Sequence, residues 1–199
     1  EKRAAEDVRT LGRNHLGNLF EVEAISIQTI FNRLAELQSN TKRTTVKIRT
    51  TLVPSGDDLW IGSVSLLDLY DFLKEYKKET GDLDQLYEKN VRKYLGGGRV
   101  VNKGIANTLK TKPEKFGLFN NVITVVAEDV QHENGTYLVS EPYVVNGCQT
   151  TKTIWQVLKE KLDTGSSQIS PETEHWRDRL RKGIVIMKLV KVGPHAESE

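Results

Sequence analysis

The stretch FNNVITVVAEDVQHENGTYLVSEPYVVNGCQTT, residues 119–151, decides the fold of this chain. Its two apolar runs, Val122–Ala127 and Tyr143–Val145, are typical of buried strands. From Thr150 onward the apolar residues recur with helical spacing, so the second strand ends in an Asn-Gly turn that runs directly into a helix. The free N–H groups and the dipole of a first helical turn favour an anion. The sequence therefore predicts an anion site at this strand–turn–helix junction.

Small polar residues gather at the ends of these two strands. Glycine at position 147 permits a positive φ and a close approach of the backbone to a ligand, and the amides and hydroxyls beside it supply hydrogen bonds. The alternative is that the asparagine and the threonines only cap the helix, and both interpretations stay open. The candidate ligand-binding residues at the junction are Asn120, Asn121, Asn146, Gly147, Gln149, Thr150 and Thr151.

The single cysteine, Cys148, lies in the same turn. A helix N-terminus lowers the pKa of a thiol, which makes Cys148 a candidate reactive thiol, but cysteine is also among the residues most often packed in a core. One cysteine excludes an internal disulfide and fits a reducing compartment. We therefore expect a cytoplasmic protein.

Composition limits the function classes. The chain has 199 residues and a net charge of +2 from 29 basic and 27 acidic residues, a balance that does not by itself indicate nucleic-acid binding. No segment approaches the roughly 20 apolar residues of a membrane helix, and the charged N-terminus is not a signal peptide. Because the sequence begins with Glu1 rather than methionine, we expect a fragment of a longer protein.

Strand and helix patterns alternate without a repeat, which predicts an α/β or α+β fold with a mixed sheet and flanking helices. The clearest helix is Leu66–Thr80, capped by Ser65 and ended by Gly81. Its predicted apolar stripe consists of Leu66, Leu69, Tyr70, Leu73 and Tyr76. We expect a core domain over 46–193, the end of a preceding region over 1–45 and a tail over 194–199. The remaining predicted helices cover 27–37, 83–95, 101–110 (opened by Asn102), 151–162 and 176–180, and the strands 20–24, 46–53, 59–64, 122–130, 137–140, 143–145 and 183–192.

Several familiar kinds of site find no support in the sequence. The Glu75-Tyr76-Lys77 triplet has the letters of a nuclease motif, but its spacing on a helix separates the two charges. The glycines at 96–98 lack the Lys-Ser or Lys-Thr ending of a phosphate-binding P-loop. No metal site is expected, because the four histidines are far apart in sequence; they are His15, His132, His175 and His195.

Three blocks of this sequence resemble the signature blocks of the AIPR family, bacterial abortive-infection phage-resistance proteins often encoded beside restriction–modification genes. The blocks are LDQLYEKNVRKYLG, VNKGIANTLKTKPEKFGLFNNVITVVAEDV and PYVVNGCQTTKTIW, and the resemblance covers residues 58–192. Where the family usually reads NNGIT, this chain has valine at position 122. Family members are commonly much longer, so flanking regions with an effector activity are expected elsewhere.

The chain is also distantly similar to the ParB/sulfiredoxin-like fold, in which an arginine motif, a strand and a turn before a helix form a nucleotide pocket. Arg92, the strand Val122–Val126 and the turn at 146–150 occupy comparable positions. Thr150 stands where those families have a phosphate-binding arginine, and Asn146 replaces an aspartate. The resemblance therefore implies that the charge comes from Arg92, Lys103 or Lys152, and it argues against sulfiredoxin-like redox chemistry at Cys148.

These observations give two functional hypotheses. In the first, a phage-defence protein binds a nucleotide or a nucleic-acid phosphate in a polar crevice, with a nucleoside triphosphate and Mg²⁺ as the candidate cofactor. Any reaction would be hydrolysis or phosphoryl transfer, although no catalytic base is identifiable. In the second, the chain is a non-enzymatic interaction or sensing module. The partners that the sequence allows are a nucleotide, DNA, other defence-system proteins and further copies of the chain, but not a membrane.

A third option is DNA binding through basic runs on the surface. The runs are Arg43, Lys47 and Arg49, and the segment 177–182. Such binding would depend steeply on salt, because phosphate contacts release counterions. The alternative is that both runs are solvated surface.

Overall fold

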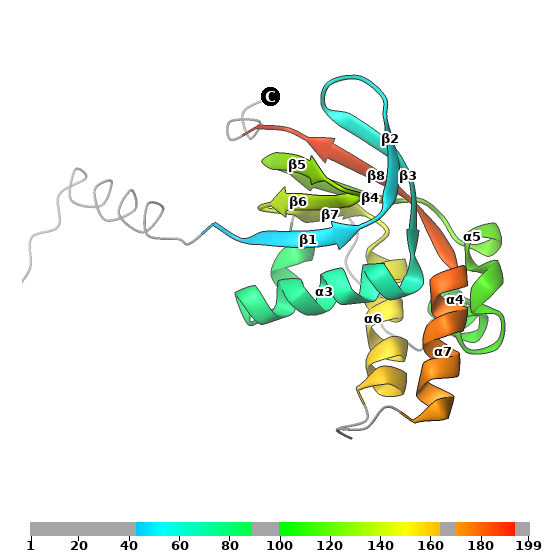
Figure 1. Ribbon diagram of the computed structural model, residues 1–199. Helices are drawn as coiled ribbons and strands as arrows, with labels where there is room; N and C mark the ends of the chain where they lie inside the picture. The colour runs from blue at the N-terminus through cyan, green and yellow to red at the C-terminus, as the bar shows by residue number, and fades with distance from the viewer. Residues whose placement is uncertain (1–42, 89–99, 164–169, 194–199) are drawn as a thin grey trace, which may run out of the picture. The chain divides into compact units, whose positions relative to one another are not determined.

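The computed structural model describes residues 43–88, 100–163 and 170–193. The chain divides into two compact units, Glu1–Lys42 and Arg43–Glu199, and all described residues lie in the second. The strand predicted at 20–24 and the helix predicted at 27–37 therefore lie outside the described residues. The elements follow one another (Figure 1) as β1 (Thr45–Arg49), β2 (Thr51–Pro54), β3 (Leu59–Ser65), α3 (Leu66–Thr80), η2 (Asp84–Tyr87), α4 (Val100–Thr111), η3 (Pro113–Lys115), α5 (Phe116–Phe119), β4 (Ile123–Ala127), β5 (Asp129–Glu133), β6 (Thr136–Ser140), β7 (Tyr143–Asn146), α6 (Cys148–Leu162), α7 (Pro171–Lys182) and β8 (Ile184–Lys191).

The described strands form two sheets. One has the order β1-β6-β5 and the other β2-β3-β8-β4-β7. Neighbouring strands pair antiparallel except β4 and β8, which run parallel, so the larger sheet is mixed. The predicted α/β class with a mixed sheet and flanking helices is confirmed.

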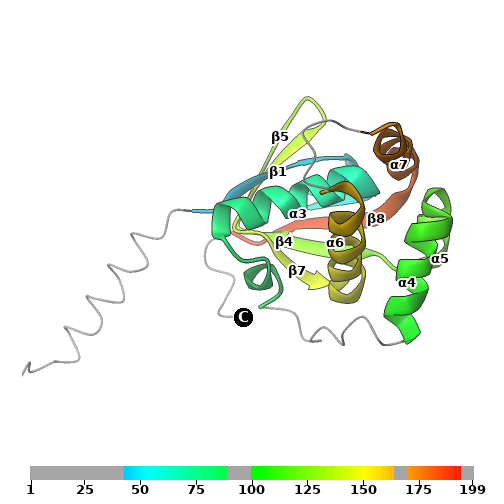
Figure 2. The ribbon, with the colours of Figure 1, turned by 90° about the horizontal axis from the view of Figure 1, so that it is seen from below.

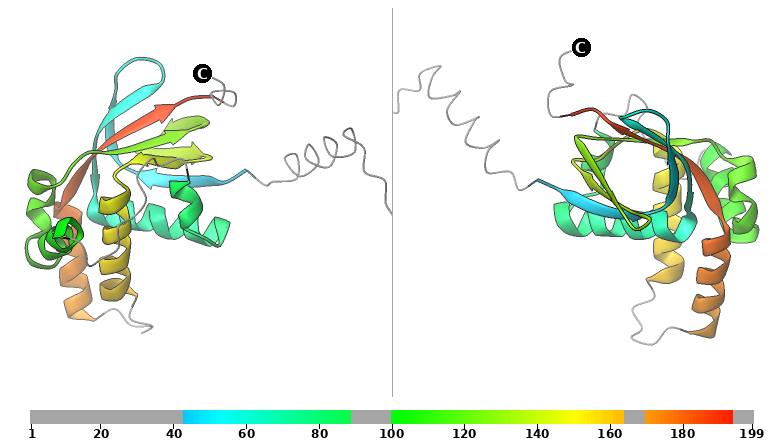
Figure 3. Two further views of the ribbon diagram at one scale, coloured as in Figure 1. Left: turned by 180° about the vertical axis from the view of Figure 1, so that it is seen from behind. Right: turned by 45° about the horizontal axis from the view of Figure 1, so that its top comes forward.

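Three bends in the chain join the two sheets. β1 passes into β2 at Thr50, β4 into β5 at Glu128, and β6 into β7 at Glu141 and Pro142. At the first bend the Thr50 hydroxyl donates to the carbonyl of Ser63 at 2.8 Å. Because each bent strand takes part in both sheets, the sheets curve around one interior, as the right-hand view of Figure 3 shows.

The interior between the sheets is apolar and closely packed. Trp60 of β3 meets Tyr137 of β6 edge to face, with ring centroids 6.4 Å apart, and the Tyr137 hydroxyl donates to the Leu52 carbonyl at 3.3 Å. These contacts tie the smaller sheet to the larger one. Buried aliphatic side chains from both sheets fill the rest of the interior; they include Val46, Ile48, Val64, Ile123, Val125, Ala127, Val139, Met187 and Leu189.

Helix α3 has the predicted bounds. The Ser65 hydroxyl accepts from the backbone N–H of Asp68 at 3.0 Å, and Gly81 ends the helix in the left-handed region at φ 78°. The predicted apolar stripe is buried, and it packs α3 against β1, α6 and α7. Helix α6 lies between α3 and α4 when the molecule is viewed from below (Figure 2).

The helix predicted at 83–95 is wrong over its described part. Residues Asp84–Tyr87 form a short 3₁₀ helix. At its start the backbone N–H of Asp84 donates to the Asp82 carboxylate at 2.9 Å. Leu83 and Leu86 are both buried, and a spacing of three brings side chains onto one line in a 3₁₀ helix. The rest of the predicted helix lies outside the described residues.

Three other predicted helices begin at the wrong residue. Asn102 does not open its helix: it lies inside α4, buried against α6. Helix α6 begins at Cys148 rather than at position 151, because Gly147 takes the N-cap position. Helix α7 covers Pro171–Lys182, longer than the predicted 176–180, because the Ser170 hydroxyl caps it and the proline suits its first turn.

Candidate functional site

A crevice opens between α4, the end of α5 and the junction of β7 with α6. Its volume is about 690 Å³, within the range of small-molecule sites. The segments that build it are far apart in sequence, and α4 and α6 pack against each other beside it (Figure 2). We call it the amide crevice; its lining residues are Val100, Val101, Gly104, Ile105, Asn107, Thr108, Phe119, Asn120, Asn121, Asn146, Gly147, Cys148, Gln149 and Thr150.

Gly147 forms the wall where β7 turns into α6. Its φ is 95°, in the left-handed region that glycine adopts at little cost. A Cβ added there would lie 2.6 Å from Cγ2 of Ile123, the first residue of β4. Only glycine fits both the backbone conformation and the space. The first turn of α6 is thereby held close against the start of β4.

The asparagines predicted as ligand residues occupy defined places at the mouth. Asn120 donates from Nδ2 to the Phe116 carbonyl at 2.9 Å, which closes the short helix α5. Asn146 donates from Nδ2 to the Val122 carbonyl at 3.1 Å, which connects the end of β7 to the residue that precedes β4. Asn121 is exposed, and its side chain makes no hydrogen bond within the described part of the chain. Two amides are therefore held in place and a third is available to a ligand.

Asn102 and Gln149 connect the two helices beside the crevice. The Asn102 side chain donates from Nδ2 to Oε1 of Gln149 at 2.8 Å, and Asn102 is only 1% exposed. This bond orients Gln149 in the first turn of α6. This role of Asn102 was not predicted. The sequence does carry a signal for it, because Asn102 shares one helical face with Ile105 and Leu109. A polar side chain on a buried face needs a hydrogen-bond partner.

The wall that α4 contributes was not predicted from the sequence. Asn107 and Thr108 lie on α4 and line the crevice, as do Val100 and Val101 at the start of that helix. Nothing in the local sequence distinguishes these side chains from solvated helix surface. Only the packing of α4 against α6, which is long-range, makes them part of a site.

Cys148 lines the crevice as a packed thiol. It is 4% exposed, and burial raises the pKa of the thiol, with a smaller opposing effect from Lys152. The helix N-terminus was expected to lower this pKa, but removal from water dominates. The protonated thiol is a poor nucleophile, so the geometry favours the packed alternative.

The remaining predicted ligand residues are divided between several places. Thr150 lines the crevice, but Thr151 is fully buried and its hydroxyl donates back to the Gly147 carbonyl at 2.9 Å. No described side chain caps the start of α6, so the capping alternative is wrong for this helix. Lys152 pairs with Asp84 at 2.5 Å in another hollow. Lys103 is exposed on α4 and does not line the crevice.

Arg92, the predicted source of positive charge, lies outside the described residues. Among the residues that the structure describes, the crevice wall holds no carboxylate, ammonium, guanidinium or imidazole group. Its polar groups are carboxamides, threonine hydroxyls and backbone N–H groups, with apolar side chains beside them. This part of the wall suits hydrogen bonding and stacking rather than proton transfer.

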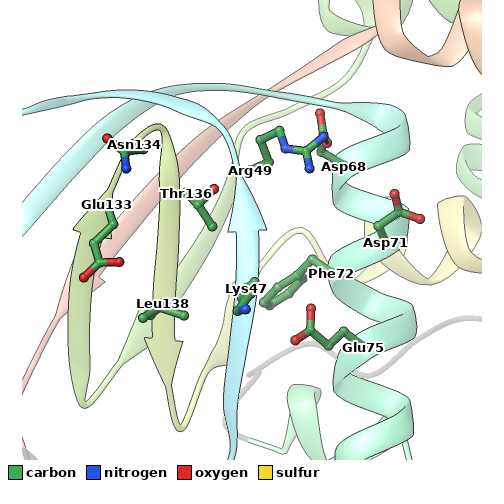
Figure 4. Close-up of a pocket in the computed structure, with 10 residues that line it drawn as sticks. All are labelled: Lys47, Arg49, Asp68, Asp71, Phe72, Glu75, Glu133, Asn134, Thr136 and Leu138. Atoms are coloured by element: carbon green, nitrogen blue, oxygen red, sulfur yellow. Dashed lines mark ion pairs between the residues drawn. The ribbon is translucent and has the colours of Figure 1, made fainter.

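A second hollow, between α3, β1 and the β5–β6 hairpin, has the opposite character (Figure 4). Its volume is about 520 Å³. Arg49 reaches Asp68 at 3.8 Å, and Lys47, Phe72 and Glu75 line the same hollow (Figure 4). We call it the charged hollow; its lining residues are Lys47, Arg49, Asp68, Asp71, Phe72, Glu75, Glu133, Asn134, Thr136 and Leu138.

The basic runs proposed for DNA binding face acidic neighbours. Lys47 and Arg49 share the charged hollow with four carboxylates. Arg43 lies 3.7 Å from Glu128, and on α7 Arg179 lies 3.1 Å from Glu114. These neighbours offset the positive charge that a DNA backbone would require.

Three further observations concern the described residues. Over the described ranges, no three His, Cys, Asp or Glu side chains gather as metal ligands would. His132 stacks on Tyr137, with ring centroids 4.3 Å apart. None of the described helices is long and apolar enough to cross a bilayer.

Comparison with known proteins gives one match. The model of a family described as AIPR protein matches residues 87–199, which is more than half of the chain. No curated protein and no solved structure matches the chain significantly. The similarity to the ParB/sulfiredoxin-like fold is therefore not confirmed. The match does support abortive infection and phage resistance as the setting in which the protein acts.

Proposed function

This chain belongs to the AIPR family, and we propose that it serves phage defence by binding a nucleotide, or the phosphate of a nucleic acid, in the amide crevice. The observation that carries the proposal is convergence: polar residues predicted from two separate strand ends line one hollow of ligand size. The first turn of α6 adds N–H groups that have no partner within the helix.

The proposal assigns no catalytic residue. Cys148 is the only ionisable side chain among the described lining residues, and its thiol is kept protonated by burial. A nucleoside triphosphate would bring its own Mg²⁺, since no described carboxylate lines the crevice to hold the ion. Arg92 is proposed to contribute charge to the phosphates.

One observation favours the second candidate function, a non-enzymatic interaction or sensing module in the cytoplasm. Exposed apolar side chains stand at and near the mouth of the crevice, with exposed fractions of 86% for Val100, 79% for Leu118 and 67% for Phe119. Large exposed apolar groups mark protein contacts. In this alternative the partner is another defence-system protein or a second copy of the chain.

Titration calorimetry with nucleoside triphosphates and Mg²⁺, and with short DNA duplexes, separates the two functions. The proposal predicts saturable binding that Asn121→Ala weakens about tenfold, the effect of losing one or two ligand hydrogen bonds. The matched control is Gln131→Ala, an exposed amide on β5, away from the crevice, which should bind normally. Absence of saturable binding to any of these ligands would overturn the proposal and leave the interaction module.

A further inference from the structure

The chemistry of the amide crevice differs from that of a phosphate site. Five carboxamide side chains line it, and among the described lining residues none is charged at neutral pH. Sites that bind phosphate groups through side chains rely on arginine or lysine. Carboxamides instead carry one donor and one acceptor group each, the combination that the edges of nucleobases also present. The five are Asn107, Asn120, Asn121, Asn146 and Gln149.

We infer that the group recognised in the amide crevice is the uncharged base or nucleoside part of the ligand, and that this part supplies most of the affinity. The inference rests on the proposed function, because it concerns the same site. It assigns hydrogen bonding to the carboxamides and leaves the phosphates to the N-terminus of α6.

Preorganisation of the amides supports the inference. Asn120 and Asn146 are held by hydrogen bonds to backbone carbonyls, at 2.9 Å and 3.1 Å, and Gln149 is held by Asn102 at 2.8 Å. A side chain that is already fixed loses little further conformational entropy when a ligand binds. Fixed donors and acceptors also discriminate between hydrogen-bonding patterns, which is what distinguishes one base from another.

The apolar part of the wall supports the inference independently. The Phe119 ring lines the crevice and is 67% exposed, although an aromatic ring is normally buried in a core. Val100 and Val101 lie on the α4 side and are also exposed. Aromatic and aliphatic surfaces of this kind stack on the faces of bases, and base–aromatic stacking is independent of phosphate.

The test is titration calorimetry of the full chain with the common ribonucleosides, with the matching triphosphates and with inorganic tripolyphosphate. At least one nucleoside is expected to bind saturably, within about tenfold of its triphosphate, while tripolyphosphate alone does not bind measurably. Phe119→Ala should weaken nucleoside binding about tenfold or more, since stacking contributes on that scale. Leu118→Ala is the matched control: Leu118 precedes Phe119 and is 79% exposed but does not line the crevice, so binding should be unchanged.

The comparison of nucleosides with their triphosphates and with tripolyphosphate separates the inference from the proposed function. If triphosphates bind but no nucleoside does, or if tripolyphosphate displaces the triphosphate completely, the base is not the recognised part and the inference is overturned while the proposed function survives. If neither nucleosides, nucleotides nor DNA bind, both fail together.

Discussion

The amide crevice and the charged hollow are two cavities of similar size in one domain, with volumes of about 690 and 520 Å³, but they are built differently. The crevice is lined by neutral polar groups that the backbone and neighbouring side chains hold in place. The charged hollow is lined by ionic side chains from α3, β1 and the β5–β6 hairpin, and Asp68 is already engaged by Arg49 and by Ser65. The difference underlies the proposal that hydrogen-bonded amides, rather than a concentration of charge, mark the binding site.

The largest effect is expected from breaking the wall of the crevice. Gly147→Ala forces an alanine to φ 95° and places its Cβ 2.6 Å from Cγ2 of Ile123. We expect a loss of about 2–4 kcal/mol in the free energy of unfolding, from backbone strain and overpacking together. Denaturant unfolding measures it. Gly135→Ala is the matched control, because φ is also positive there, at 75°, but nothing lies within 4 Å of the added Cβ. Equal losses in the two variants would mean that Ile123 does not restrict the junction.

Next in size is the bond that orients Gln149. Asn102→Ala removes a buried donor to Oε1 of Gln149, and we expect a loss of about 1–3 kcal/mol in the free energy of unfolding. Asn107→Ala, an exposed change on the same helix, should alter stability by less than about 0.5 kcal/mol. If the two substitutions cost the same, the crevice would be no more rigid than the surface and the comparison with the charged hollow would lose its basis.

The thiol inside the crevice gives a smaller, pH-dependent effect. Burial raises the pKa of Cys148, so the folded chain keeps this proton at a pH where the unfolded chain has begun to lose it. The thiol therefore contributes no pH dependence below its ordinary range, and the free energy of unfolding falls as the pH rises above about 8. Alkylation by iodoacetamide near pH 8 should be several-fold slower in the native chain than in urea. Equal rates would contradict a packed thiol.

The smallest effect is expected in the charged hollow. Arg49→Ala removes a pair with Asp68 that is 3.8 Å long and largely exposed on the arginine side. Such pairs contribute less than about 1 kcal/mol and are weakened by salt. Thermal unfolding at low and high salt measures the difference, with Lys47→Ala as a control for loss of a charge alone. A loss above about 2 kcal/mol would mean that this hollow, too, is a rigid structure.

Local sequence patterns predicted helix α3 and most of the described strands correctly. The Ser65 cap, the apolar stripe of α3 and the glycine that ends it lie within sixteen residues of one another, and all were correct. The strands predicted within the described residues were also found, except that the bends at Thr50 and Glu128 divide two of them between sheets. Those bends depend on partner strands far along the chain, which periodicity does not reveal.

The candidate site was predictable to the extent that it depends on strand ends. Asn120, Asn121 and Asn146 were expected to meet, and they line one crevice. The contribution of α4 was not predictable, because it comes from helix packing. Thr151 and Lys152 follow Thr150 directly in sequence, but the helix directs the Thr151 hydroxyl to the Gly147 carbonyl and the Lys152 ammonium to Asp84.

The most direct test of the account compares the two cavities in one measurement: the change in backbone amide NMR shifts of the full chain on saturation with a nucleoside that binds in calorimetry. The account predicts that the largest changes fall at Asn121, Gly147 and Gln149, with the β1 amides of Lys47 and Arg49 unchanged. Changes concentrated on β1 and the β5–β6 hairpin, with the α6 N-terminus unaffected, would contradict it.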